Sequence, residues 1–308
     1  MSHGQVSTRH RRMFCLMLLF MLTLVFLPPA KAQAETQDLK GVKVAVYVGA
    51  GVMSSSYTAL TNMFEWMNAT AEPVIASQIG DGILDDYDII VFPGGSEHNY
   101  YLDLNTTGMQ KIKDFVSAGG SYFGICGGST FGANYLQFLN GSVRPVYEPG
   151  TTQHLTIMHI NRSSTGPDLS GCPENVSVLY WGSQYFEPWA GASIIPIASY
   201  DYNGKAGMVA FKHHKGTVFL SSPHPEYEEG SDRDGTTAYD SLNDPESEWG
   251  ILFQVAKWLV EASVVESSTP TANSDLPLNV DLLLITLASI GVAGVVVVGA
   301  LLYRQNHK

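Results

Sequence analysis

Short β-rich runs alternate with helical stretches through the first half of the chain, and this alternation constrains the fold more than any other feature. The β-rich runs lie at 43–48, 72–77, 88–92 and 121–125. Apolar side chains recur at helical spacing between them, at 57–67 and 109–118, and a further helix-like stretch ends at Leu139. Strands and helices that alternate over short connections build a parallel sheet with helices on both faces. The sequence therefore predicts an α/β domain with a doubly wound parallel sheet of the flavodoxin-like type.

Beyond Gly141 the helical spacing disappears, and β-rich segments follow one another. They lie at 155–160, 176–181, 194–200, 207–211 and 216–221. We expect these segments to supply further core strands and an inserted or peripheral antiparallel layer. An amphipathic stretch at 248–261 predicts a closing helix.

Residues 1–34 have the features of a secretory signal peptide. Three arginines precede an almost wholly apolar run at 13–27, and two prolines and small-x-small cleavage motifs follow that run. This order is typical of export signals. The run is also short for a membrane span, which needs roughly 20 residues. An uncleaved signal anchor remains the alternative.

Residues 281–303 have the features of a membrane-spanning helix. The stretch 282–303 carries no charge and is long enough to cross roughly 30 Å of hydrocarbon as a helix. The basic tail at 304–308 is expected in the cytoplasm, and the small, polar segment at 266–280 is expected to form a stalk. The sequence thus predicts a single-pass type I protein of the cell membrane, with its domain at 35–265 outside the cytoplasm.

The charge of the chain is concentrated in its middle. The full sequence has 17 Lys and Arg, 29 Asp and Glu, and a net charge of −12. Six of the basic residues and none of the acidic ones lie at 1–34 and 304–308, which leaves 11 basic against 29 acidic side chains, a net charge of −18. Such a surface repels nucleic acid and anionic lipid headgroups, so neither is expected as a ligand of the domain.

Asn-x-Ser/Thr sequons recur along the expected exterior domain. They fall at Asn68, Asn105, Asn140, Asn161 and Asn175. Their presence agrees with a glycosylated exterior, and chance occurrence of this short motif is the alternative.

Cys126 lies where the predicted strand at 121–125 meets the next helix, in the run GICGG at 124–128. Small flanking residues permit a sharp turn that presents the middle side chain above the sheet, as in nucleophile elbows. A helix N-terminus lowers a thiol's pKa and offers free N–H groups beside it. Cys126 is therefore the candidate nucleophile. An inert buried thiol and a disulfide with Cys172 are the alternatives, because export favours disulfides.

A His-Pro-Glu motif follows the last β-rich run. His224 and Glu226, two residues apart in extended chain, share a face. His224 can then act as the base toward Cys126 while Glu226 orients its ring.

A Pro-Gly-Gly turn ends the predicted strand at 88–92. Ligands of parallel sheets bind beyond the carboxyl ends of the strands, where both this turn and Cys126 lie. The N–H groups of Gly94, Gly95 and Gly127 are therefore candidates for an oxyanion hole. A plain turn is the alternative for the two glycines of the Pro-Gly-Gly motif.

These three motifs, in this order and on these elements, resemble the class I glutamine amidotransferases. The tract SEHNYY at 96–101 and the GICGG elbow are most similar to one branch, the N-terminal domain of some biotin-protein ligases. The resemblance covers roughly 42–262 and supports the roles given to Cys126, His224 and Glu226. It does not extend to a ligase catalytic region, so ligase activity is not implied.

Three functions remain open at this point. The first is a thiol hydrolase of γ-glutamyl, amide or peptide bonds in a small-molecule or peptide substrate, for which secreted γ-glutamyl hydrolases of this superfamily offer a precedent. The second is a glutamine amidotransferase, which the expected topology opposes because no synthase would receive the ammonia. The third is a catalytically silent binding or receptor module, since fold does not fix function. The membrane is an expected partner through the C-terminal helix, and the sequence identifies no protein partner.

No cofactor or metal is expected. His213 and His214 have no carboxylate or cysteine at ligand spacing and are expected in an exposed hairpin. Asp232 and Asp234 lack the full pattern of a calcium loop. Several aromatic residues line either the pocket or the core: Tyr180, Trp181, Tyr185, Phe186 and Trp189.

Overall fold

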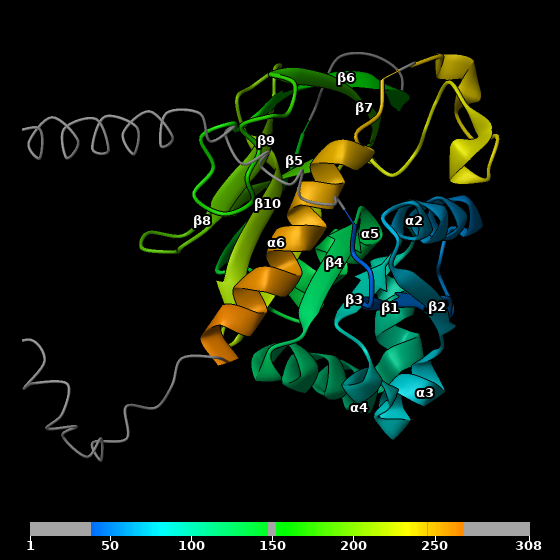
Figure 1. Ribbon diagram of the computed structural model, residues 1–308, viewed down its shortest axis with the longest axis vertical. Helices are drawn as coiled ribbons and strands as arrows, with labels where there is room; N and C mark the ends of the chain where they lie inside the picture. The colour runs from blue at the N-terminus through cyan, green and yellow to red at the C-terminus, as the bar shows by residue number, and fades with distance from the viewer. Residues whose placement is uncertain (1–37, 147–151, 245, 268–308) are drawn as a thin grey trace, which may run out of the picture. The chain divides into compact units, whose positions relative to one another are not determined.

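The computed structural model describes residues 38–146, 152–244 and 246–267. A nine-stranded sheet forms the centre of this part of the chain (Figure 1). Its strands run in the order β2 (Thr70–Val74), β1 (Lys43–Tyr47), β3 (Ile89–Phe92), β4 (Ser121–Ile125), β11 (Gly216–Ser221), β10 (Ala206–His213), β9 (Ile195–Tyr200), β6 (Gln153–Ile160) and β7 (Asn175–Trp181).

The sheet has a parallel half and an antiparallel half. Strands β2, β1, β3, β4 and β11 pair in parallel. From β11 onward through β10, β9, β6 and β7 every pairing is antiparallel. The predicted α/β fold with a parallel sheet and extra antiparallel strands is thereby confirmed. A separate pair, β5 (Gly141–Pro145) and β8 (Gln184–Pro188), was not predicted.

Helices cover both faces of the parallel half (Figure 1). Helices α2 (Ser54–Trp66) and α6 (Trp249–Ser267) lie on one face, and α3 (Ala76–Asp81) and α4 (Glu97–Ala118) lie on the other. Successive strand residues point to opposite faces. Phe123 accordingly packs in the cluster of Phe64 and Leu252, whereas its neighbour Tyr122 packs in the cluster of Ile112. Burying such a side chain contributes roughly 1.5–3 kcal/mol, so β4 is held firmly from both sides.

Short helical turns occupy the connections. They are α5 (Gly127–Thr130), the π-helical turn η2 (Phe131–Tyr135), and the 3₁₀ turns η1 (Ile83–Asp86), η3 (Asp232–Asp234) and η4 (Asp240–Leu242). The helix-like stretch expected up to Leu139 forms, but it ends at Tyr135 and its second part is π-helical, since glycines in this stretch weaken an α-helix.

Two other element boundaries differ from prediction. The expected helix at 109–118 forms the second part of α4, after a kink at Asn105, whose φ of 49° and ψ of −169° are not helical. An additional helical part runs from Glu97 to this kink, because Ser96 caps it and Tyr100 and Leu104 are buried. The predicted strand at 72–77 ends at Val74 and gives way to α3. In both places tertiary packing outweighs the local sequence pattern.

No helix of the described residues is both long and apolar enough to cross a membrane. The expected signal peptide (1–34), membrane span (281–303) and cytoplasmic tail (304–308) lie outside the described residues. Of the expected stalk at 266–280, only the first two residues are described, and they belong to α6.

Candidate active site

Cys126 occupies a strained turn between β4 and α5. Its φ is 50° and its ψ −114°, a conformation that residues with a Cβ rarely adopt. The turn depends on the glycine that follows: a Cβ on Gly127 would lie 2.0 Å from the carbonyl oxygen of Gly95. The predicted elbow geometry is present, and it lifts the thiol out of the line of the strand.

His224 and Glu226 follow β11, the strand that pairs directly with β4. The His224 backbone N–H donates to the carbonyl oxygen of Leu179 at 2.9 Å, which fixes the chain here. His224 Nδ1 lies 2.9 Å from Glu226 Oε1, and both side chains are completely buried. With Nδ1 engaged, Nε2 is the nitrogen left for Cys126, and among the described residues it has no nitrogen or oxygen partner.

The pKa values of this pair move in opposite directions. Burial alone raises the pKa of the Cys126 thiol, but the charge of His224, its hydrogen bond and the Gly127 N–H outweigh burial and lower it. Burial likewise lowers the pKa of His224, yet the negative charges of Glu226 and Cys126 and the hydrogen bonds to both raise it to about 10. These directions favour a thiolate–imidazolium pair, the reactive form of a nucleophilic cysteine.

The backbone N–H groups of Gly95 and Gly127 lie beside this pair. The backbones of the two glycines pack against each other, because a Cβ on Gly127 would collide with the carbonyl oxygen of Gly95. Within the described residues the Gly95 N–H donates to no nitrogen or oxygen, and the Gly127 N–H donates a hydrogen bond to the Cys126 sulfur. Two donors side by side at a nucleophile are what an oxyanion hole needs.

Gly94 does not fit the donor role that the sequence predicted for it. Its N–H donates to Ser56 Oγ at 2.8 Å and is therefore already used. A Cβ at this position would lie 2.7 Å from Cε1 of His224. Gly94 instead provides the close approach of the turn to the histidine ring.

Ser56 is a member of the site that sequence reasoning missed. It lies in the first turn of α2, is completely buried, and donates to Glu226 Oε1 at 2.6 Å. Its sequence context is a run of three serines, and nothing local distinguishes it from its neighbours.

Aromatic side chains flank His224. The Trp181 ring centroid lies 5.9 Å from that of His224, and Tyr239 lies 6.0 Å from Trp181. Of the aromatic residues singled out from the sequence, Trp181 is thus beside the triad, while Tyr180 and Phe186 are buried in the core. Tyr239 was missed, because it comes from a turn whose sequence carries no motif.

Cys172 does not pair with Cys126, and both are free thiols. Cys172 precedes the first residue of β7, whereas Leu179 and Trp181, near the end of that strand, contact His224. The strand spans about 20 Å, and a disulfide requires Cα atoms within roughly 7 Å. The structure therefore gives the disulfide alternative no support.

The residues considered for metal binding do not converge. Among the described residues no group of three or more His, Cys, Asp or Glu side chains is arranged to hold a metal ion. Asp234 is buried and accepts from the N–H groups of Glu228 and Thr236, whereas Asp232 is exposed. His213 ends β10 and His214 lies in the tight turn into β11, so both are at the predicted hairpin.

Three buried carboxyl groups lie close to one another in the segment that follows the triad motif. Glu229, Asp244 and Glu248 are each at most 4% exposed. Both Glu229 oxygens lack partners within the described residues. Burial raises the pKa of Glu229 to about 8, and the negative charges of Asp244 and Glu226 add to the effect. Glu229 is therefore largely protonated at neutral pH.

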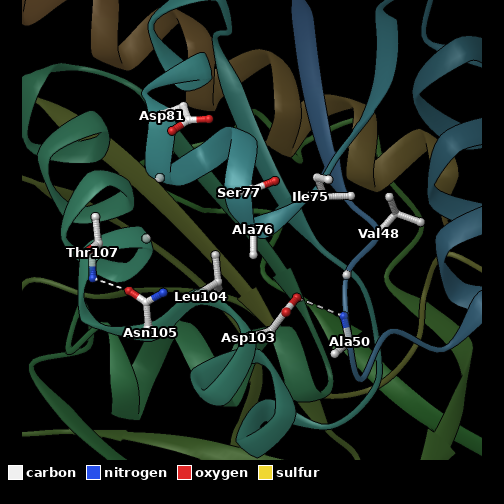
Figure 2. Close-up of a pocket in the computed structure, with 13 residues that line it drawn as sticks. Val48, Ala50, Ile75, Ala76, Ser77, Asp81, Asp103, Leu104, Asn105 and Thr107 are labelled. Atoms are coloured by element: carbon white, nitrogen blue, oxygen red, sulfur yellow. Dashed lines mark hydrogen bonds between the residues drawn. The ribbon is translucent and has the colours of Figure 1, made fainter.

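A separate pocket of about 760 Å³ opens beyond the ends of β1 and β2. Figure 2 shows Val48 and Ala50 on one side, Ile75 to Ser77 on another, and Asp103 to Thr107 of α4 closing it. Asp103 accepts from the Tyr47 hydroxyl and, at 3.1 Å, from the Ala50 N–H. No triad residue lines this pocket, and the Asp103 carboxylate is engaged in holding the loop after β1.

The sequon asparagines differ in accessibility. Asn161 is partly buried, and its Nδ2 donates to the carbonyl oxygen of Pro196 at 2.9 Å. The others are exposed: Asn68, Asn105, Asn140 and Asn175.

The overall fold is that of the class I glutamine amidotransferase-like proteins. A glutamine amidotransferase from Thermotoga maritima superposes with a TM-score of 0.51 and 17% identity, covering 71% of this chain and 98% of that one. PurLQS from the same organism gives a TM-score of 0.51 and 16% identity over the same shares. At such identities these structures establish the fold alone.

The sequence matches a more specific branch of this superfamily. Residues 42–149 match the family described as biotin-protein ligase, N terminal. The biotin–protein ligase of Schizosaccharomyces pombe is 30% identical over 165 residues, 46% of this chain and 26% of the ligase. An uncharacterized protein of Chlamydia muridarum is 30% identical over 157 residues, 45% of this chain and 60% of that protein. The predicted resemblance to the biotin-protein ligase N-terminal branch is confirmed, and the chain aligns with only part of each relative.

Proposed function

We propose that this protein is a thiol hydrolase that cleaves a γ-glutamyl, amide or peptide bond in a small-molecule or peptide substrate. The observation that carries the proposal is the arrangement of Cys126 on a strained elbow against buried His224, whose Nδ1 is held by Glu226. Nucleophile, base and orienting acid in this order are the components of covalent acyl transfer.

The reaction follows from the geometry. The Cys126 thiolate attacks the substrate carbonyl, and the oxyanion that forms is stabilised by the N–H groups of Gly95 and Gly127. His224 gives its Nε2 proton to the departing amine, which leaves a thioester on Cys126. Water, deprotonated by His224, then attacks the thioester and releases the acid and the Cys126 thiolate, beside a His224 that is again protonated. Glu226 keeps the ring in place and favours its protonated form throughout.

The expected exterior location belongs to the same proposal. A signal peptide at 1–34 and a span at 281–303 would place the domain outside the cytoplasm, anchored to the cell membrane, with glycans on exposed sequons. Addition of protease to intact cells expressing the full chain tests this: loss of the domain with protection of the tail supports the topology.

Labelling with iodoacetamide across pH, with peptide mass spectrometry of the full-length protein, tests the chemistry. We expect Cys126 to label with an apparent pKa below the usual thiol value of about 8.5. Replacement His224→Ala should remove this advantage. Cys172 is an internal reference, because burial raises the pKa of its thiol. If Cys126 labels no faster than Cys172, the enzyme proposal fails, and a catalytically silent binding module becomes the better interpretation.

A substrate screen follows if Cys126 is reactive. Glutamine, γ-glutamyl p-nitroanilide and short peptides cover the three bond classes. Turnover that is lost in Cys126→Ala assigns the bond.

A further inference from the structure

We infer that Ser56 is a positioning residue of this site, linking the acid of the triad to the turn that carries the oxyanion donor. Its Oγ lies 2.6 Å from Glu226 Oε1 and 2.8 Å from the Gly94 nitrogen. The three groups come from different elements: the first turn of α2, the loop after β11 and the turn after β3. The inference rests on the proposed function.

The direction of both hydrogen bonds follows from the groups themselves. A backbone N–H can only donate, so Ser56 Oγ accepts from Gly94. The single hydroxyl proton of Ser56 is then left for Glu226, whose carboxylate can only accept. One hydroxyl thus satisfies a buried donor and a buried acceptor at once.

Glu226 depends on this bond for its orientation. Oε1 accepts from both Ser56 and His224 Nδ1, whereas Oε2 is buried and has no partner among the described residues. Without the Ser56 hydroxyl, the His224 ring would be the remaining side-chain contact that fixes the carboxylate. The Glu226 carboxylate would then be held in place only by the His224 ring, and it could no longer fix the orientation of that ring.

Gly94 depends on the same bond for its position. The turn packs so closely on His224 that no Cβ fits, and the next residue, Gly95, lies against Gly127. Loss of the Ser56 acceptor leaves the buried Gly94 N–H unsatisfied, which favours a shift of the turn. Ser56 therefore couples the placement of the general base to the placement of the oxyanion donors.

The test compares Ser56→Ala with the matched control Ser55→Ala in the full-length protein. Ser55 is the adjacent residue and also loses a hydroxyl hydrogen bond, which it makes with the Tyr227 hydroxyl at 2.8 Å rather than with Glu226. Alanine is smaller than serine and favours helix, so both variants are expected to fold, and thermal melts check this. Ser56→Thr keeps the hydroxyl and serves as the conservative variant.

Two chemical probes test the two contacts of Ser56 separately, the one with Glu226 and the one with Gly94. Iodoacetamide reports the Cys126–His224 pair through the pH profile of alkylation. Release of p-nitrophenolate from p-nitrophenyl acetate, corrected with Cys126→Ala, reports acylation, which needs the oxyanion donors as well. We expect Ser56→Ala to change the alkylation profile and to slow acylation about tenfold or more, as for a lost hydrogen bond to a charged group. Ser55→Ala should match the wild type, and Ser56→Thr should retain most of both activities.

A wild-type pH profile and acylation rate in Ser56→Ala would overturn the inference while leaving the proposed function intact. Equal impairment of Ser56→Thr and Ser56→Ala would also overturn it, because packing rather than the hydroxyl would then matter. An unreactive Cys126 in the wild type would instead refute the proposed function, and the inference with it.

Discussion

The hydroxyl of Tyr100 lies 3.0 Å from the carbonyl oxygen of Gly94 and donates to it. The N–H of Met53 donates to the same oxygen at 2.9 Å. The C=O and N–H of a trans peptide point in opposite directions. Anchoring the Gly94 oxygen on one side of the turn therefore fixes the Gly95 N–H on the opposite side.

Replacement Tyr100→Phe should weaken this anchor without disturbing the triad. We expect acylation by p-nitrophenyl acetate to slow about tenfold, because the hydroxyl that contacts the carbonyl oxygens of both Pro93 and Gly94 on this turn is lost. The pH profile of Cys126 alkylation should stay as in the wild type. Tyr101→Phe, at the adjacent and exposed position, is the control and should change neither rate.

Cys126→Gly should be more stable than Cys126→Ala. Glycine adopts the φ of 50° at this turn without the steric cost that any Cβ brings, a cost of roughly 1–3 kcal/mol. The greater freedom of glycine in the unfolded chain returns roughly 0.5–1 kcal/mol of this. Urea unfolding should therefore place the glycine variant about 1 kcal/mol above the alanine variant. Equal or reversed stability would show that the turn is not strained.

Glu229→Gln should stabilise the protein in alkaline solution only. The pKa of Glu229 rises from its usual 4.5 to about 8 in the folded state. A raised carboxyl pKa means that the folded state holds the proton more tightly, so its stability is fully present below pH 4.5 and is lost as pH rises through about 8.

Thermal melts at pH 5 and pH 9 measure this difference. The Tm of Glu229→Gln should match the wild type at pH 5 and exceed it at pH 9. Glu246→Gln, an exposed position on the same loop, should have no effect at either pH. A variant that is less stable at pH 9 would mean that the ionised Glu229 has a favourable partner.

Glycan occupancy should be lowest at Asn161 if the domain is exported. Glycosylation attaches to Nδ2, and within the described residues only at this sequon is that atom seen donating to the backbone of a neighbouring strand, at the Pro196 carbonyl oxygen. Peptide mapping after enzymatic deglycosylation in heavy-oxygen water would score each site. Occupancy at Asn161 equal to that at the exposed Asn140 would count against this expectation.

The triad was predictable because each member stands in a short motif that follows a strand. Cys126 is flanked by glycines, and His224 and Glu226 share one tripeptide, so the motifs and their places after strands were enough to group them. Ser56 and Tyr239 were not predictable in this way. Their roles arise from contacts between distant elements, and neither has a distinctive local sequence.

The same limit applies to the fold. The buried runs of β1, β3 and β4 are strongly apolar and were placed within a residue or two. β5 and β8 are short, largely polar at the surface, and stabilised by pairing with each other, which no local pattern reveals. The first half of α4 was missed for a similar reason, since its polar surface hides two buried anchors.

The position of β11 in the sheet has a consequence for the order of folding. β11 pairs with β4, but β5 to β10 separate the two strands along the chain. During synthesis the elbow of Cys126 therefore emerges long before its base, and contacts of such high sequence separation form slowly. A nascent or truncated chain that ends near residue 149 would carry the nucleophile without His224. The high reactivity of Cys126 should thus appear only when β11 has paired with β4 and the whole domain has folded. The rate of Cys126 alkylation can therefore report the last step of folding.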